Sequence, residues 1–418
     1  MIERDFSITV SKFALRMTLF IALFLPALAS PQKDSPEPMA ISRQDRLKVF
    51  DEAWQAVNKH YFDPQFNGVN WERVKEQYRP QVEAANNKIQ LSETLQKMLD
   101  ELGSSHLNIT VQVKLKKQHV EQELGRKVSR KESLLFDAGM EYVRINGKSV
   151  ISAVANGSSA QLAGVQRGWA LTHWNGEPYL GESPFTCELD QKVEARFLDL
   201  QGKERSLALT CKLYPAPPSA PERVTRQLDN GAVYLRFSAF THGTEDWLAG
   251  QMTQARSAPA IVIDLRGNGG GLLVIMQKCL EPFFSQATTL GEHRERNGKQ
   301  QSLKVGGRGK NAYRGLVIVL IDEMTASAAE IFAAALQETG RALVVGRQSD
   351  GDVLGSLSYS LSHSFRVNIP IWDYQTAKGI RLEKRGVTPD ERVPLTLKDF
   401  LENRDLDLEH AQKLLQKP

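Results

Sequence analysis

Short apolar segments alternate with helical patterns in the second half of the chain, and this alternation limits the possible folds more than any other feature of the sequence. Strands are predicted at residues 232–237, 260–264, 316–321 and 342–346. Helices are predicted between them, at residues 272–280 and 327–339. Because alternating strands and helices pack as layers, we expect an α/β core.

A proline-rich run at residues 214–221 separates this core from what precedes it. Proline lacks the backbone N–H donor and fixes φ, so the run cannot form a helix or a central strand. We therefore predict a domain boundary there, a core domain at residues 222–396 and a helical tail at residues 397–418. Within the core, the polar stretch at residues 285–310 is interpreted as a long irregular insertion.

Two smaller units are predicted before the boundary. Apolar side chains recur at helical spacing after Ser42, a plausible helix cap, so residues 42–107 are interpreted as a helical unit, with its third helix starting at Ser92. Residues 114–132 carry many charges and are expected to form a solvated connector. Residues 134–213 are expected to be rich in β-structure, with strands at 142–145, 149–154, 170–174, 193–200 and 206–213.

The N-terminus has the pattern of an export signal. Lys12 and Arg16 precede an apolar run of 13 residues, 17–29, that ends in Ala-Leu-Ala. A membrane-spanning helix needs roughly 20 apolar residues, so we expect a cleaved signal peptide at residues 1–29 and no permanent membrane anchor; an uncleaved anchor is the alternative. An exported protein, periplasmic or secreted, would meet an oxidising environment, in which Cys187 and Cys211 either pair or stay unpaired.

The charge balance excludes one large class of partner. The chain has 53 Lys and Arg against 49 Asp and Glu, a net charge of +4 over 418 residues. Nucleic-acid binding requires a concentrated basic surface, so no nucleic-acid partner is expected. The cysteines and histidines show no zinc-ligand spacing, so neither a metal nor another cofactor is expected.

Three short motifs carry residues suited to catalysis. A predicted strand ends at Asp264, and the glycine-rich turn at residues 267–271 follows it. Backbone amides of this turn could bind an anion or form an oxyanion hole, or the segment could be a tight turn without a ligand. Nucleotide binding is the weakest interpretation, because the Gly-Lys-Ser/Thr ending of a phosphate loop is missing. Ser327 begins a predicted helix, either as a nucleophile or as a cap paired with Glu330. His106, next to Ser105, is suited to general-base work.

The order of these motifs, together with Gly-Val-Thr-Pro-Asp at residues 386–390, resembles the serine peptidase family of carboxyl-terminal processing peptidases and the tricorn protease core. The resemblance implies a crotonase-like or ClpP-like α/β core. Residues 150–178, with their Gly-Ser-Ser-Ala and Ala-Gly-Val segments, resemble part of a PDZ domain, which places an inserted PDZ domain at residues 134–213.

The resemblance also implies roles for single residues. Ser327 matches the nucleophile, and the amides of Ala328 and Gly270 match the oxyanion hole. The lysine base of the processing peptidases is replaced by Asp352. The tricorn pattern instead implies a catalytic set in which Ser327 attacks and His106 accepts its proton, while Ser105 fixes the imidazole and Glu383 supports the network. Lys378 and Lys384 are the alternative bases.

The resemblance implies polypeptide substrates. A PDZ domain binds a peptide as an added strand, and Ala138, Gly139 and Met140 are where its carboxylate-binding loop is expected. We therefore predict an exported serine endopeptidase, guided by substrate C-termini or gated by its PDZ domain. The alternative is a peptide-binding scaffold that lost activity when the lysine became Asp352. The oligomeric state stays open.

Overall fold

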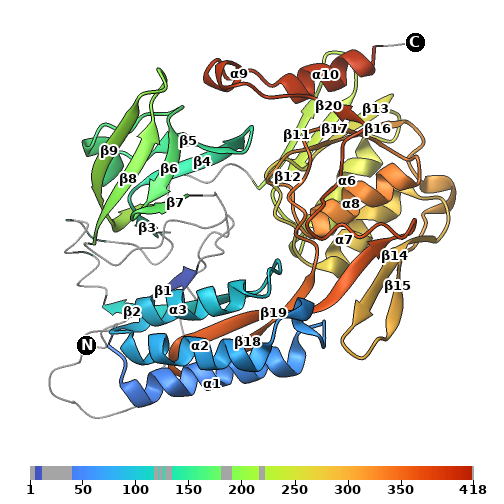
Figure 1. Cartoon of the computed structure of the whole chain (residues 1–418). Coiled ribbons are helices and arrows are strands. Elements are labelled where there is room, and N and C mark those ends of the chain that lie inside the picture. Colours follow the sequence, from blue (N-terminus) through green and yellow to red (C-terminus); the bar gives the residue numbers. More distant parts are fainter. Residues whose placement is uncertain are drawn as a thin grey trace. The chain divides into compact units, whose positions relative to one another are not determined.

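The structure is a computed structural model, which describes residues 5–11, 40–116, 121, 125, 127, 134–179, 191–215 and 222–416 (Figure 1). The chain divides into two compact units, each described separately below. The N-terminal unit consists of Met1–Tyr61, Gln65–Pro218 and Leu357–Ile369, and the C-terminal unit consists of Phe62–Pro64, Ser219–Ser356 and Pro370–Pro418. The break between Pro218 and Ser219 falls inside the proline-rich run.

Three helices of the N-terminal unit lie where the apolar spacing predicts them. They are α1 (Arg43–His60), α2 (Trp71–Ala84) and α3 (Lys88–Asp100), and a short 3₁₀ turn, η1 (Phe66–Gly68), precedes α2. Ser42 caps α1 through its hydroxyl, which accepts a hydrogen bond from the Asp45 N–H at 3.1 Å. The third helix starts before Ser92, because Asn87 caps it and Ser92 is buried within it.

The helices pack through stacked aromatic side chains and support a β-ribbon. The parallel rings of Trp54 and Trp71 have centroids 6.4 Å apart. After α3, β2 (Asn108–Lys116) pairs antiparallel with β1 (Asp5–Ser11) and with the first residues of β19 (Phe365–Thr376). The connector predicted at residues 114–132 is therefore wrong for residues 114–116, which belong to β2, and most of its remainder lies outside the described residues.

Residues 134–215 form an antiparallel sheet with a short helix. The sheet has the order β4-β5-β6-β8-β9, with β7 beside β6, and a separate ribbon pairs β3 with β10. The elements are β3 (Leu134–Asp137), β4 (Met140–Ile145), β5 (Lys148–Val154), α5 (Ser159–Leu162), β6 (Ala170–Trp174), β7 (Glu177–Pro178), β8 (Lys192–Leu198), β9 (Glu204–Thr210) and β10 (Lys212–Pro215). The predicted strands are confirmed, except that the last one divides into β9 and β10.

The cysteines differ in state. Cys211 is buried and disulfide-bonded, whereas Cys187 lies outside the described residues. Cys279, in the C-terminal unit, is a free buried thiol. Burial raises the pKa of Cys279 to about 12, so this thiol stays protonated near neutral pH and cannot act as a nucleophile.

The C-terminal unit is built on a six-stranded sheet, which confirms the predicted α/β core. Its order is β11-β12-β13-β16-β17-β20, in which β11 is antiparallel and the other strands are parallel. The strands are β11 (Arg223–Gln227), β12 (Val233–Phe237), β13 (Ala260–Asp264), β16 (Leu316–Ile321), β17 (Leu343–Gly346) and β20 (Glu391–Arg392).

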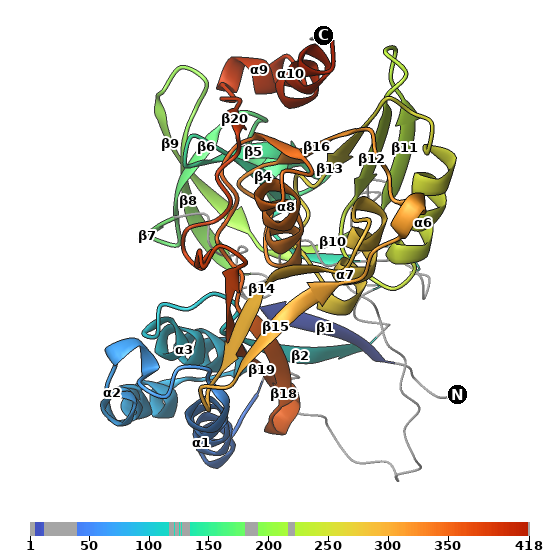
Figure 2. The ribbon, with the colours of Figure 1, turned by 90° about the vertical axis from the view of Figure 1, so that its right-hand side faces the viewer.

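Alternate residues of the sheet point to two separate cores. Ile261, Ile263 and Val319 belong to the core shared with α6 (Thr244–Gln254), α7 (Leu273–Leu280) and α8 (Ala328–Glu338). Val262 and Ile318 belong to the opposite core, which includes Ala411 of α10 (Leu406–Leu414), the helix after α9 (Leu397–Leu401). Figure 2 shows α8 and α10 on opposite faces of β13 and β16. Both faces are thus covered, as a parallel sheet requires.

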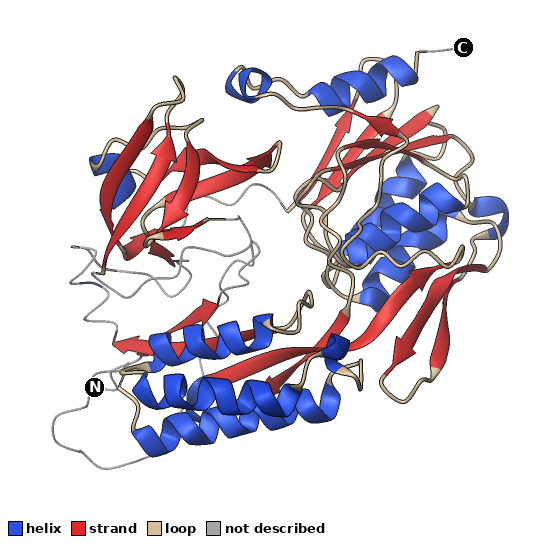
Figure 3. Ribbon diagram, viewed as in Figure 1, coloured by secondary structure: helices blue, strands red, loops and turns tan. Residues whose placement is uncertain are grey.

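The prediction of an irregular insertion at residues 285–310 is wrong. Most of this stretch is a hairpin of β14 (Thr288–Glu295) and β15 (Gln300–Val305), and β14 pairs with the last residues of β19 (Figure 3). Leu290, Leu303 and Val305 face the core, while the polar side chains between them cover its outer face. The remaining elements are η2 (Glu281–Phe283), η3 (Gly309–Asn311), β18 (Gly355–Ser360) and η4 (Ser362–Ser364).

The termini bear on two further predictions. The predicted helical tail contains α9 and α10. Of the predicted signal peptide at residues 1–29, the structure describes only β1, and the remainder lies outside the described residues. None of the described helices is both long and apolar enough to cross a membrane.

Candidate active site

Ser327 lies in the C-terminal unit, where the loop after β16 opens α8. Its backbone has φ 57° and ψ −125°, whereas a helix cap normally has extended backbone with negative φ. Such a conformation in a residue with a side chain costs on the order of 1–3 kcal/mol and persists only where its surroundings enforce it. The residue is partly exposed. A strained, accessible serine at the positive end of a helix dipole favours the nucleophile over the simple cap.

Glu330 enforces this conformation from one turn further along α8. Its carboxylate is fully buried and accepts the Ser327 N–H at 3.0 Å, so Glu330 does contribute to the cap. It also accepts the Ser349 hydroxyl at 2.6 Å and the N–H groups of Gly351 and Asp352 at 2.8 and 3.0 Å. One carboxylate therefore ties the loop at residues 349–352 to the start of α8.

The protonation of Glu330 reflects two opposing effects. Burial raises the pKa of its carboxyl group to about 8, against the hydrogen bonds from Ser349, Gly351 and Ser327, which favour the charged form. The sequence points to this role only indirectly, since Glu330 is the one charged residue in the apolar stretch 328–336, and its spacing from Ser327 alone indicates a cap.

The glycine-rich turn packs directly against the serine. Gly270 has φ +94°, and a Cβ at this position would lie 2.6 Å from the Ser327 Cβ and 2.8 Å from the Ala328 nitrogen. Only glycine allows this approach. The Gly270 N–H donates to the Asn268 Oδ1 at 2.9 Å, so this predicted oxyanion donor already has a protein acceptor. For the Ala328 N–H, the described residues provide no acceptor, as expected for the first turn of a helix.

Asn268 holds this turn in place, and the sequence motifs did not single it out. It is fully buried, and its Nδ2 donates to the Phe237 carbonyl oxygen at 3.0 Å. Its own carbonyl oxygen accepts the Ala326 N–H at 3.0 Å, next to the serine. The glycine-rich turn and the serine loop are thus joined by main-chain and side-chain hydrogen bonds.

Replacement of Gly270 by alanine is expected to disrupt the site. The new methyl group would displace the Ser327 loop, and a shift of about 1 Å in a catalytic group can cost on the order of 10²-fold in rate. Peptide hydrolysis by Gly270→Ala should fall by at least that factor. Gly250→Ala is the control, because Gly250 is exposed within α6 and a Cβ there meets nothing within 4 Å. Comparable activity of the two variants would contradict the assignment.

Ser105 and His106 lie together in the N-terminal unit, between α3 and β2. Ser105 is buried, and its hydroxyl lies 3.2 Å from Nδ1 of the His106 ring. His106 has φ +57°, and its carbonyl oxygen accepts a hydrogen bond from Asn368 Nδ2 at 2.7 Å. These contacts fix both the ring and the backbone of His106.

Glu383 lies in the C-terminal unit, on a segment that contacts Val353, the residue after the loop that Glu330 holds. Its side chain is buried, and its Oε2 accepts the Val353 N–H at 3.2 Å. The alternative bases Lys378 and Lys384 are both exposed. Ser327, Gly270, Ala328 and Glu383 thus belong to one unit, and Ser105 and His106 to the other.

The predicted carboxylate-binding loop, Ala138 to Met140, is buried in the N-terminal unit. The Gly139 N–H donates to the carboxylate of Asp137, and burial raises the pKa of Asp137 to about 6. The carbonyl oxygens of Ala138 and Gly139 accept the N–H groups of Ala160 and Ala155 at 3.0 and 2.9 Å. The segment is therefore fixed onto the turn around α5, and the Gly139 N–H already has an acceptor.

A partly exposed serine in an enforced backbone conformation, packed against a glycine turn at the carboxyl ends of parallel strands, is an arrangement that suits a serine hydrolase on an α/β fold. Comparisons with known proteins agree. Residues 231–393 match peptidase family S41, and residues 42–100 match the tricorn protease C1 domain.

Relatives extend the match over most of the chain. The tricorn protease homolog 2 of Streptomyces coelicolor is 26% identical over 90% of this chain, which spans only 32% of that protein. A carboxyl-terminal-processing protease of Synechocystis is 26% identical over 87% of this chain and 85% of its own length. The photosystem II D1 C-terminal processing protease has the same fold, with a TM-score of 0.56, 22% identity and coverage of 90% of this chain and 98% of that one.

Residues 231–393 thus form an S41 peptidase domain, the domain of a serine-type peptidase.

Proposed function

We propose that this protein is an exported serine endopeptidase that hydrolyses polypeptides, with Ser327 as its nucleophile. The observation that carries the proposal is the enforced positive φ of Ser327 opposite the glycine backbone at Gly270. A helix cap requires neither feature. A nucleophile must be held away from its own helix and next to oxyanion donors, so it requires both the positive φ and the close glycine backbone.

The reaction would proceed through an acyl-enzyme. His106 accepts the Ser327 hydroxyl proton as the Ser327 Oγ attacks the scissile carbonyl carbon, and the carbonyl oxygen becomes an oxyanion. His106 then returns the proton to the leaving amine as the C–N bond breaks, and a water repeats the sequence to release the acyl group. The contact between Ser105 Oγ and His106 Nδ1 supports this role, because an Nδ1–H donated to Ser105 leaves the Nε2 lone pair to accept the proton.

The oxyanion would receive two N–H groups. The Ala328 N–H has no acceptor among the described residues and supplies the first. The Gly270 N–H supplies the second by sharing its proton between the oxyanion and Asn268 Oδ1, a three-centre bond of a common kind. Glu383 supports the loop at residues 351–353 and adds negative charge that stabilises the imidazolium.

The finer architecture is also part of the proposal. The core would be of the crotonase or ClpP type, and residues 134–213 would form a PDZ domain, which the six-stranded sheet with its short helix supports. Recognition of substrate C-termini at Ala138 to Met140 would require the substrate carboxylate to replace Asp137 on the Gly139 N–H. A signal peptide at residues 1–29 would direct the protein to the periplasm or the medium.

Labelling with a fluorophosphonate probe tests the nucleophile. The wild-type protein is expected to gain one adduct, located on Ser327 by peptide mass spectrometry. His106→Ala should slow labelling by a factor on the order of 10³ or more, because the base is lost. Lys384→Ala, which removes an exposed lysine, should label at the wild-type rate. A properly folded protein without any adduct would favour the inactive scaffold, in which Asp352 replaced the catalytic base.

A further inference from the structure

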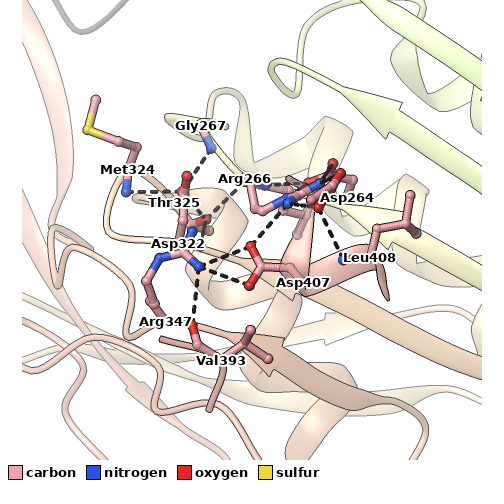
Figure 4. Close-up of polar contacts among 12 residues, drawn as sticks. Asp264, Arg266, Gly267, Asp322, Met324, Thr325, Arg347, Val393, Asp407 and Leu408 are labelled. Atoms are coloured by element: carbon pink, nitrogen blue, oxygen red, sulfur yellow. Dashed lines mark hydrogen bonds and ion pairs between the residues drawn. The ribbon is translucent and has the colours of Figure 1, made fainter. Parts of the chain in front are cut away.

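A network of charged side chains lies at the carboxyl ends of β13, β16 and β17, within the C-terminal unit. Arg266 and Arg347 are its two cations, and each contacts carboxylates from more than one segment (Figure 4). The carboxylates that the two arginines contact are Asp264, Glu323, Asp405 and Asp407. Most of these groups are largely shielded from water, so their interactions are stronger than those of surface ion pairs.

Arg266 is the second residue after β13 and leads into the glycine-rich turn. Its guanidinium donates to Asp264 Oδ1 and Oδ2 at 2.9 and 2.7 Å and to Asp407 Oδ2 at 3.0 Å. Although burial opposes its charge, the Asp264 carboxylate holds the pKa of Arg266 above its usual value. Arg266 is therefore a fixed cation at the start of the turn that contains Gly270.

Arg347 follows β17 and reaches the serine loop. Its Nε donates to Glu323 Oε2 at 3.0 Å, four residues before Ser327, and its Nη1 donates to Asp407 Oδ1 at 2.9 Å. The neighbouring Asp322 accepts the Gly267 N–H at 2.9 Å and the Met324 N–H at 3.1 Å, so the serine loop and the glycine turn are also joined directly.

Asp407 of α10 is the group that both arginines share. The residue is 3% exposed, while Asp405, which caps α10, has a side chain that is 39% exposed. Without the Asp407 charge, Arg266 would keep Asp264 and Arg347 would keep Glu323, but the two arginines would lose the buried carboxylate that joins them, so the segments that carry them could shift apart. The affected segments are the two that hold Gly270 and Ser327.

We propose that Asp407 is a positioning residue of the peptidase site. It joins Arg266, at the start of the glycine-rich turn, to Arg347, which contacts the serine loop through Glu323. Asp407 thereby sets the position of Gly270 relative to Ser327. The proposal rests on the proposed function for its catalytic consequence. The coupling itself is a property of the fold and can be measured without any reaction.

Asp407→Asn tests the proposal, with fluorophosphonate labelling as the readout. The variant keeps the shape of the side chain and loses its charge, and the labelling rate constant is expected to fall about tenfold to a hundredfold while the final labelled fraction stays at the wild-type level. A purely structural role would lower the final fraction, since unfolded molecules do not label. In peptide hydrolysis, kcat should fall with little change in KM. Asp407→Glu, which restores the charge, should recover part of the rate.

Glu409→Gln is the matched control on the same helix, because Glu409 pairs with Arg404 at the surface and not with the network. It should label at the wild-type rate. Amide hydrogen exchange is the independent measurement: residues 265–271 and 322–327 should exchange faster in Asp407→Asn than in Glu409→Gln. Unchanged hydrogen exchange in both segments would overturn the inference, whether or not the wild-type protein reacts with the fluorophosphonate. A wild-type protein that does not react with the probe would count against the proposed function alone.

Discussion

Ser327→Ala is expected to abolish peptide hydrolysis without unfolding the protein. The substitution removes the attacking oxygen, and loss of a catalytic serine lowers kcat by a factor on the order of 10⁴ to 10⁶. The new side chain is smaller and sits at a partly exposed position, so the free energy of unfolding should change by no more than about 0.5 kcal/mol. Hydrolysis of an unstructured polypeptide, followed by mass spectrometry, and thermal unfolding of both proteins provide the measurement.

The control for this experiment is Ser364→Ala, which removes a hydroxyl from η4, away from the serine loop in the sequence. Wild-type activity is expected for that variant. If Ser327→Ala kept more than a few per cent of the activity, another nucleophile would have to act, and the burial of Cys279 excludes that thiol.

Glu330→Gln is expected to damage both stability and activity. The four groups that donate to this carboxylate would meet an amide, whose NH₂ group cannot accept hydrogen bonds. Leaving buried donors unpaired costs roughly 1–3 kcal/mol each, so a loss of at least about 2 kcal/mol in the free energy of unfolding is expected below a pH of about 8, with kcat lower by on the order of 10²-fold. Chemical denaturation and peptide hydrolysis measure the two effects. Glu338→Gln, at the other end of α8, should have little effect on either.

The same variant should change how stability depends on pH. The carboxyl group of Glu330 has a folded-state pKa of about 8 against an ordinary value of 4.5, so the folded protein binds more protons than the unfolded chain between these values. Stability from this group is therefore fully present below pH 4.5 and is lost as the pH rises through about 8. Between these limits, the free energy of unfolding should fall more steeply with pH in the wild type than in Glu330→Gln. Parallel slopes would contradict this assignment.

The centre of the parallel core could be predicted from the sequence because β13 and β16 are buried on both sides. Residues 260–263 and 316–321 are continuous apolar runs, and β13 and β16 begin and end where predicted. The hairpin of β14 and β15 could not be predicted in the same way. Its buried large side chains are Leu290, Leu303 and Val305, and the polar residues between them have the composition of a loop. A strand that is buried on both sides shows a continuous apolar run in the sequence, whereas a polar hairpin that is buried on one side does not.

The candidate site shows a similar division. The sequence motifs single out Ser327 and the glycine turn, because both follow buried strands and both have residue types with a recognised chemical use. They do not reveal that Glu330 also binds residues 349–352, since those contacts cross 19 to 22 positions and depend on how the loop folds back. The sequence does not reveal the role of Asp407 either, because its partners Arg347 and Arg266 lie 60 and 141 residues away along the chain.

The tie between Asn368 and His106 has a consequence for the order in which the protein folds. The two residues are 262 positions apart, and β2, which follows His106, pairs with the beginning of β19. Contacts between such distant positions form late, because a long loop must close first. During synthesis, the histidine segment therefore lacks its partner strand until the ribosome has made residues 365–368. With His106 in its proposed role as the base, the nascent chain would stay inactive until these residues are made, which would limit damage to itself and to its neighbours.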